Sequence, residues 1–109
     1  MANTFKLKTK ANVGVTTVGI YTAPAATTTV VIGITMANTS GSGVNVGVGI
    51  TRAGTTEAVK LLKNAPLPQG SSLEFMSGTK IVLEATDTVT VDSDTNNSVD
   101  AALTIMEIT

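Results

Sequence analysis

Apolar and polar side chains alternate along most of this chain, the pattern expected of β-strands whose two faces meet different surroundings. The clearest stretch is 44–50, in which asparagine or glycine separates four β-branched apolar residues. In 28–37 a second apolar row lies opposite smaller side chains. The members of the two rows are Val44, Val46, Val48 and Ile50, and Val30, Ile32, Ile34 and Met36. Because 38–43 is rich in Asn, Ser and Gly, we expect 28–37 and 44–50 to pair as a hairpin.

Further alternating or β-branched runs are separated by turn residues. They lie at 5–10, 14–23, 57–63, 72–76, 80–84, 88–93 and 99–108. Only 57–63 has a composition that a helix would tolerate. Pro66 and Pro68 cannot donate to a ladder, so their segment is predicted to be a loop or a strand edge. Eight or nine short strands predict an all-β chain, with 1–109 forming a single-domain antiparallel β-sandwich. Jelly-roll and immunoglobulin-like topologies both fit this pattern.

Two local patterns point to contacts. Gly47 and Gly49 lie inside a predicted strand with no helix after them, which favours close approach of a neighbouring backbone over a phosphate loop. In 5–10, Phe5 and Leu7 share one face, and a basic row of Lys6, Lys8 and Lys10 occupies the other. We interpret 1–12 as a docking arm or an edge strand. The lysines either protect an edge or dock on an acidic surface of a partner, and Phe5 and the three lysines are the candidate interaction residues.

Composition narrows the functional classes. The chain has 109 residues, a net charge of −1, and neither cysteine nor histidine. Disulfides, thiol nucleophiles, Cys/His zinc sites and imidazole bases are therefore excluded. Only 14% of the residues are charged, against about 25% in an ordinary domain. Either much of the surface is covered in an assembly, such as a homo-oligomer, or abundant Thr, Ser and Asn keep an exposed neutral surface soluble.

Nucleic-acid and membrane partners are not expected. Nucleic-acid binding leaves clustered Lys and Arg, often with aromatic stacking residues, whereas this chain has one arginine, Arg52, and 3% aromatic residues. No run approaches the roughly 18 consecutive apolar residues of a membrane span. The first residues also lack the apolar core of a signal peptide.

No catalytic constellation is predicted, and no cofactor. Ser77 and Lys80 match the S-x-x-K spacing of serine acyl-enzymes, but that chemistry requires a helix and the tetrapeptide is typical of a β-turn. Glu84 and Asp87 flank another turn. Paired carboxylates can act on sugars, but such a site normally adds an aromatic-lined cleft, and there is no tryptophan. We therefore interpret these acids as solvated turn residues.

The segment 92–97 resembles the first half of a calcium loop. Its sixth position is Asn97 instead of glycine, and its twelfth is Leu103 instead of a bidentate glutamate, so an EF-hand is excluded. A looser metal site would use Asp92, Asp94 and Asp100. The simpler interpretation is a polar hairpin tip whose side chains bond their own backbone.

Five segments carry a resemblance to a family. The chain is similar to small β-sandwich virion structural proteins of tailed bacteriophages over 21–25, 31–39, 62–73, 80–87 and 100–108. Where such proteins often have Ala-Gly-Asp, this chain has Ala85-Thr86-Asp87. These segments specify strands and turns and transfer no active site.

The resemblance implies a non-enzymatic protein made in the bacterial host cytoplasm and located in the virion. Its partners would be the major capsid protein or other virion proteins, as well as copies of itself. Capsid decoration or cementing is the first expectation, and a neck, collar or tail accessory is the second. A receptor- or carbohydrate-binding module is a further alternative, for which Tyr21 would be the aromatic platform.

Overall fold

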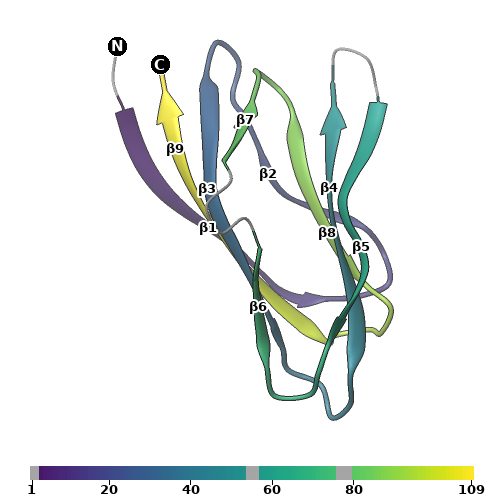
Figure 1. Ribbon diagram of the computed structural model, residues 1–109. Helices are drawn as coiled ribbons and strands as arrows, with labels where there is room; N and C mark the ends of the chain where they lie inside the picture. The colour runs from purple at the N-terminus through teal and green to yellow at the C-terminus, as the bar shows by residue number, and fades with distance from the viewer. Residues whose placement is uncertain (1–2, 54–56, 76–79) are drawn as a thin grey trace.

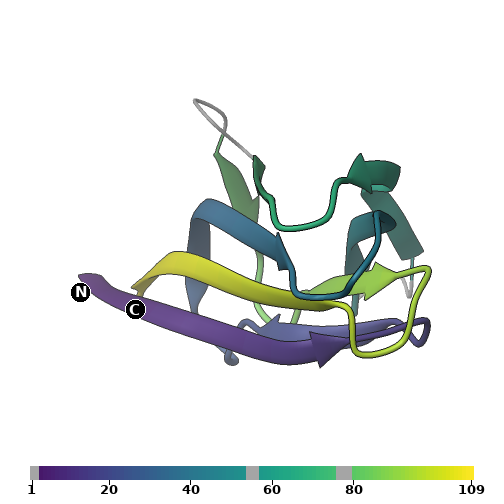
Figure 2. The same cartoon turned by 90° about the horizontal axis from the view of Figure 1, so that it is seen from below.

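The computed structural model describes residues 3–53, 57–75 and 80–109, and nine strands run through them. They form two antiparallel sheets packed as a sandwich without helices, so the predicted fold class is confirmed (Figures 1 and 2). Sheet A contains β1 (Asn3–Val13), β9 (Val99–Ile108), β3 (Thr28–Asn38), β6 (Ser72–Phe75) and β7 (Ile81–Leu83). Sheet B contains β2 (Val18–Thr22), β8 (Thr88–Ser93), β4 (Val44–Arg52) and β5 (Glu57–Leu67).

The strand order is that of a jelly roll. Sheet A runs β1-β9-β3-β6, with β7 also paired to β3, and sheet B runs β2-β8-β4-β5. The chain can be followed as one long hairpin in which β1 pairs with β9, β2 with β8, β3 with β6 and β7, and β4 with β5. Rolling this hairpin up adds the pairings of β9 with β3 and of β8 with β4. This order decides between the two topologies that the sequence left open.

The core lies between the sheets and follows the alternation of the strands. In β4, Val44, Val46, Val48 and Ile50 are all buried, as predicted. In β9 the buried apolar residues are Val99, Ala101, Leu103 and Ile105. Each sheet thus supplies one apolar face, and the two faces interdigitate.

The predicted hairpin between 28–37 and 44–50 is wrong. β3 belongs to sheet A and β4 to sheet B, so 39–43 crosses from one sheet to the other. Asn38 shapes this crossing: its side-chain amide donates to the carbonyls of Ser42 and Leu67, and its Oδ1 accepts from the Ser40 amide and hydroxyl. Turn-forming residues therefore mark a reversal of the chain, but they do not identify the strand that pairs after it.

The prediction of which β3 side chains face the core is correct for only half of the strand. Ile34 and Met36 are buried as expected, but Val31 is buried in place of Val30 and Ile32. The pairing with β9 shifts register between Val31 and Gly33, so one extra residue inverts the alternation there. As a result, two large apolar side chains leave the core for the outer face of sheet A.

The other predictions about strands fare better. The stretch 57–63 is part of strand β5, and Pro66 lies in that strand at the edge of sheet B, where a missing donor costs nothing. A Cβ on Gly49 would lie 2.9 Å from the carbonyl oxygen of Val59, so close approach of the β5 backbone is confirmed there. The predicted strand 14–23 is shorter, beginning at Val18.

The described residues include no helix long and apolar enough to cross a membrane.

Candidate interaction surface and buried polar cluster

Strand β1 turns its apolar side chains outward and its lysines inward. Residues directly opposite each other in an antiparallel pair share a face. Lys6 is opposite Ile105, Lys8 opposite Leu103 and Lys10 opposite Ala101, all of which belong to the core face. Phe5 and Leu7 consequently lie on the outer face of sheet A, where they are 68% and 65% exposed. β1 is at the edge of its sheet (Figure 1). Its lysines therefore belong to the open margin of the sandwich.

The outer face of sheet A carries a continuous apolar row. Phe5 is opposite Met106, Met106 is opposite Val30, and Val30 is opposite Val82, so the row crosses β1, β9, β3 and β7. Val82 is 59% exposed. The half-buried side chains of Met106, Val30, Ile32 and Ile108 extend this surface. Exposed apolar patches of this kind mark interaction sites on soluble proteins.

The other half of the same face is lined by small residues. A shallow hollow of about 340 Å³ lies there over β1, β9 and β3, and its lining includes two charged residues, Lys10 and Asp100. The other lining residues are small: Thr9, Ala11, Thr35, Ala37, Ala101 and Ala102. We call the whole surface, with its bulky half around Phe5 and its hollow half around Ala102, the outer face of sheet A.

A buried polar cluster joins the two sheets near the chain ends. The Tyr21 hydroxyl of β2 donates to Glu107 Oε2 of β9 at 2.6 Å and lies 2.9 Å from Thr29 Oγ1 of β3. Lys6 Nζ of β1 lies 3.0 Å from Glu107 Oε1. Tyr21, Thr29 and Glu107 are buried, so their hydrogen bonds replace the water that these groups lose on folding.

Burial and the hydrogen bond to Glu107 raise the pKa of Tyr21 to about 12. The hydrogen bond from Tyr21, with that from Lys6, lowers the pKa of Glu107 below its usual range. Tyr21 is therefore a structural residue, and its prediction as an exposed carbohydrate platform is wrong. One sequence signal did point to the cluster: Glu107 continues the buried alternation of Val99 to Ile105.

A second ion cluster ties β4 to the β7–β8 turn. Arg52 contacts Glu84 Oε1 at 2.6 Å and Asp87 Oδ2 at 2.9 Å. Asp87 also accepts a hydrogen bond from the backbone N–H of Glu84. Asp87 is buried, so its prediction as a solvated turn acid is wrong, whereas Glu84 is exposed. Hydrogen bonding and attraction to Asp87 raise the pKa of Arg52.

The three candidate metal-binding carboxylates serve separate structural contacts. Asp92 Oδ2 accepts from Thr17 Oγ1 and lies 3.2 Å from Lys60 Nζ, and Asp94 Oδ1 accepts from the Asn45 N–H. Asp100 Oδ1 accepts from the backbone N–H of Asn12 in β1. Within 3–53, 57–75 and 80–109, no group of three His, Cys, Asp or Glu side chains is placed to hold a metal ion.

Of the S-x-x-K tetrapeptide, Ser77, Gly78 and Thr79 lie outside the described residues, and Lys80 is exposed just before β7.

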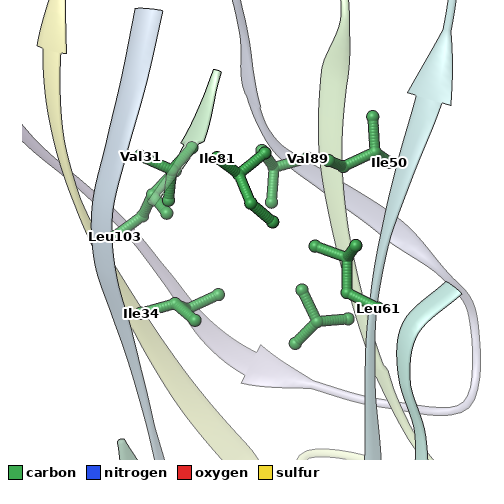
Figure 3. A pocket seen from close by; sticks show the side chains of 8 residues that line it. Val31, Ile34, Ile50, Leu61, Ile81, Val89 and Leu103 are labelled. Carbon is green, nitrogen blue, oxygen red and sulfur yellow. The ribbon is translucent and has the colours of Figure 1, made fainter. Parts of the chain in front are cut away.

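The space between the sheets offers little room for a ligand. Figure 3 shows side chains from both sheets pointing toward one another. They line a cavity of about 10 Å³. Its lining is entirely apolar: Val31, Ile34, Val48, Ile50, Leu61, Ile81, Val89 and Leu103. A cavity this small barely admits one water molecule, and an apolar lining gives that water no partner. We therefore describe it as a packing gap.

No protein-family model and no curated protein matches this chain. Solved structures do match its fold. A chain of the cyanophage Pam1 capsid has a TM-score of 0.59 at 17% identity, covering 95% of this chain and 85% of that one. A chain from the disulfide-linked pili of Bacillus endospore appendages has a TM-score of 0.57 at 16% identity, covering 99% and 87%. A chain of infectious bursal disease virus, strain Gx, has a TM-score of 0.57 at 13% identity, and this chain spans a third (33%) of it. At these identities the likeness establishes a shared jelly-roll-like fold.

Proposed function

We propose that this chain is a non-enzymatic structural subunit of a tailed-bacteriophage virion, bound to the major capsid protein as a decoration or cement protein of the head shell. The observation that carries this proposal is the orientation of strand β1, whose apolar side chains lie on the outer face of sheet A. It exposes Phe5 and Leu7 on an apolar sheet face that a free monomer would have no reason to maintain. The likeness to capsid and pilus chains supports an assembly role.

Adhesion in such an assembly would not use disulfides. The chain contains no cysteine, unlike the disulfide-linked pili that share its fold. Its low charge leaves burial of apolar surface, worth about 25 cal/mol per Å², as the main source of adhesion. A lattice with many identical contacts can use weak individual interfaces because their effects accumulate.

The N-terminal strand is the proposed docking element, through which the chain reaches a neighbouring subunit or the shell, with Phe5, Lys6, Lys8 and Lys10 as its contact residues. Lys6 is engaged by Glu107, whereas Lys10 is exposed at the margin of the sandwich. Only Val13 of this strand is buried in the core, so deleting residues 1–12 should leave a folded domain that no longer binds particles.

The deletion also uncovers the backbone edge of β9, so a milder variant is needed as well. Lys10→Glu keeps β1 intact and should weaken binding to particles, while Lys63→Glu on β5 serves as the matched control. Full particle binding by both the truncated chain and Lys10→Glu would rule out the docking role of β1.

The copy number per purified particle, measured by quantitative mass spectrometry against the major capsid protein, tests the proposal as a whole. A ratio near one, or a simple fraction of it, supports lattice decoration. A few to a few dozen copies would instead place the chain in the neck, collar or tail. Absence from particles would refute the virion assignment.

A further inference from the structure

The outer face of sheet A is uncharged over most of its area. Its charged side chains among the described residues are Asp100 and Glu74, which lie opposite Ala37 and Thr35 toward the hollow half, and Lys10 also lines the hollow at the edge strand. Lys6 and Lys8 of β1 lie on the other side of the sheet, opposite Ile105 and Leu103. A strongly charged partner would therefore find few complementary charges here, and all of them in the hollow half. The chemistry of this face fits a second apolar, uncharged surface.

The face also divides into two halves of opposite relief. The bulky half carries Phe5 and Val82 as protruding side chains, and Ala11 and Ala102 line the hollow half. Both halves include residues of β1, β9 and β3, displaced along the same strands. Consider two copies stacked face to face and related by a two-fold axis that lies between the faces and runs across the strands. This rotation places the bulky half of one copy against the hollow half of the other.

We propose that two copies of this chain associate through the outer face of sheet A, stacked face to face about such a two-fold axis. The inference rests on the proposed role of the chain as an assembly subunit and assigns the surface through which the copies meet. The axis passes near the row of Leu7, Thr104 and Gly33, which separates the two halves. A Cβ on Gly33 would meet nothing within 4 Å, so the middle of the face is open to a partner.

The available area is sufficient for a weak dimer. Four strand positions spaced about 4.8 Å apart and about eight residues long at about 3.3 Å per residue cover roughly 500 Å² on each copy. Two copies would bury about 1,000 Å², the lower limit for a specific interface. An interface of this size suits a contact that is repeated many times in a lattice better than a permanent isolated dimer.

Sedimentation equilibrium of the purified chain over a wide concentration range tests this surface. We expect reversible dimers. Phe5→Ser should reduce the association constant by at least about tenfold, because each dimer loses two buried aromatic rings. Thr104→Glu should abolish dimers, because two like charges would meet beside the axis. Val15→Ser removes an apolar side chain that is 57% exposed in the β1–β2 loop, and it should leave association unchanged.

Chemical cross-linking detects the dimer directly, without a variant that weakens it. Because the chain has no cysteine, Thr104→Cys places one thiol near the axis, and a short bis-maleimide reagent should link two copies. Thr22→Cys on the outer face of sheet B is the matched control and should give no linked dimers.

The outcomes separate this inference from the proposed function. If the chain dimerises but Phe5→Ser and Thr104→Glu dimerise equally well, another surface is used and the inference is wrong, while the virion role stands. If the chain stays monomeric up to its solubility limit, self-association through this face is also refuted. If the monomer still needs Phe5 to bind particles, the face belongs to the shell protein. The copy number in particles independently decides the proposed function.

Discussion

At the scale of single residues, Glu107 shows how a charge is kept at a core position. The alternation of β9 places it among apolar neighbours, and hydrogen bonds from Tyr21 and Lys6 stabilise the carboxylate there. Its folded pKa is lowered, so its contribution to stability is present above the ordinary glutamate pKa of about 4.3. That contribution is lost as the pH falls through the lowered pKa.

Glu107→Gln should therefore reduce stability at neutral pH and flatten the acid side of the stability profile. Urea unfolding between about pH 3 and pH 7 measures both effects. Glu74→Gln, which alters an exposed carboxylate, is the control. An acid limb that is the same in Glu107→Gln as in the parent chain would contradict the role given to this cluster.

For Tyr21 we expect the opposite pH dependence, a loss of stability at alkaline pH. Its folded pKa is about 12 and its ordinary value about 10, so its stabilising contribution is complete below pH 10 and is lost as the pH rises toward 12. Tyr21→Phe should remove this alkaline limb and cost about 1–3 kcal/mol at neutral pH, because Glu107 and Thr29 lose a buried partner. Tyr21 is the only tyrosine, so tyrosinate absorbance follows it directly. Ionisation near pH 10 in the folded chain would show that the predicted shift is absent.

Thr86 occupies a backbone conformation that suits glycine. Its φ is 69°, in the left-handed region that costs an L-residue about 1–2 kcal/mol. The Ala85-Thr86-Asp87 turn thus has a geometry that the glycine of an Ala-Gly-Asp turn would adopt without strain. Thr86→Gly should stabilise the chain by about 1 kcal/mol in thermal and urea unfolding, whereas Thr90→Gly, inside β8, should destabilise it. A loss of stability in Thr86→Gly would mean that the threonine hydroxyl matters more than backbone strain.

At the scale of elements, alternation predicted the strands and the buried face of β4, because both depend on neighbouring residues. Alternation did not predict the features that depend on residues far away in the sequence. The bulge after Val31 inverts half of β3, and an extra residue leaves no mark on a period-two pattern. Pairing of β3 with β9 instead of β4 depends on residues about seventy positions away. In β1 the alternation was correct, but only the register with β9 shows that Phe5 lies outside.

The close approach of the β4 and β5 backbones at Gly49 can be tested by substitution. A Cβ on Gly49 would lie 2.9 Å from the carbonyl oxygen of Val59, so Gly49→Ala forces a backbone shift and should cost about 1–3 kcal/mol. Gly33→Ala in β3 has open space and should be neutral or stabilising by about 0.4–1 kcal/mol. Both are measured by urea unfolding at a concentration where the chain is monomeric. Equal losses in the two variants would contradict this explanation.

At the scale of the whole molecule, the jelly roll joins the two ends of the chain in one sheet. β1 and β9 pair from Asn3 with Ile108 to Val13 with Val99, so the terminal strands complete the fold together. The same closure brings Lys6 to Glu107 and sets Phe5 beside Met106. Neither the buried cluster nor the outer apolar row exists in any local segment. The sequence could therefore suggest an assembly role through its low charge, but it could not locate the surface.

Salt dependence separates the two contact surfaces that this arrangement creates. Exposed charges are screened beyond about 10 Å at 0.1 M salt, whereas apolar burial is undiminished or strengthened by salts such as sulfate. Association of two copies through the outer face of sheet A should therefore persist or increase as sodium sulfate is added. Docking that depends on Lys10 should weaken under the same additions, and the Lys10→Glu variant should lose that dependence. If self-association falls steeply with salt, the copies meet through the charged margin of the sandwich and not through its apolar face.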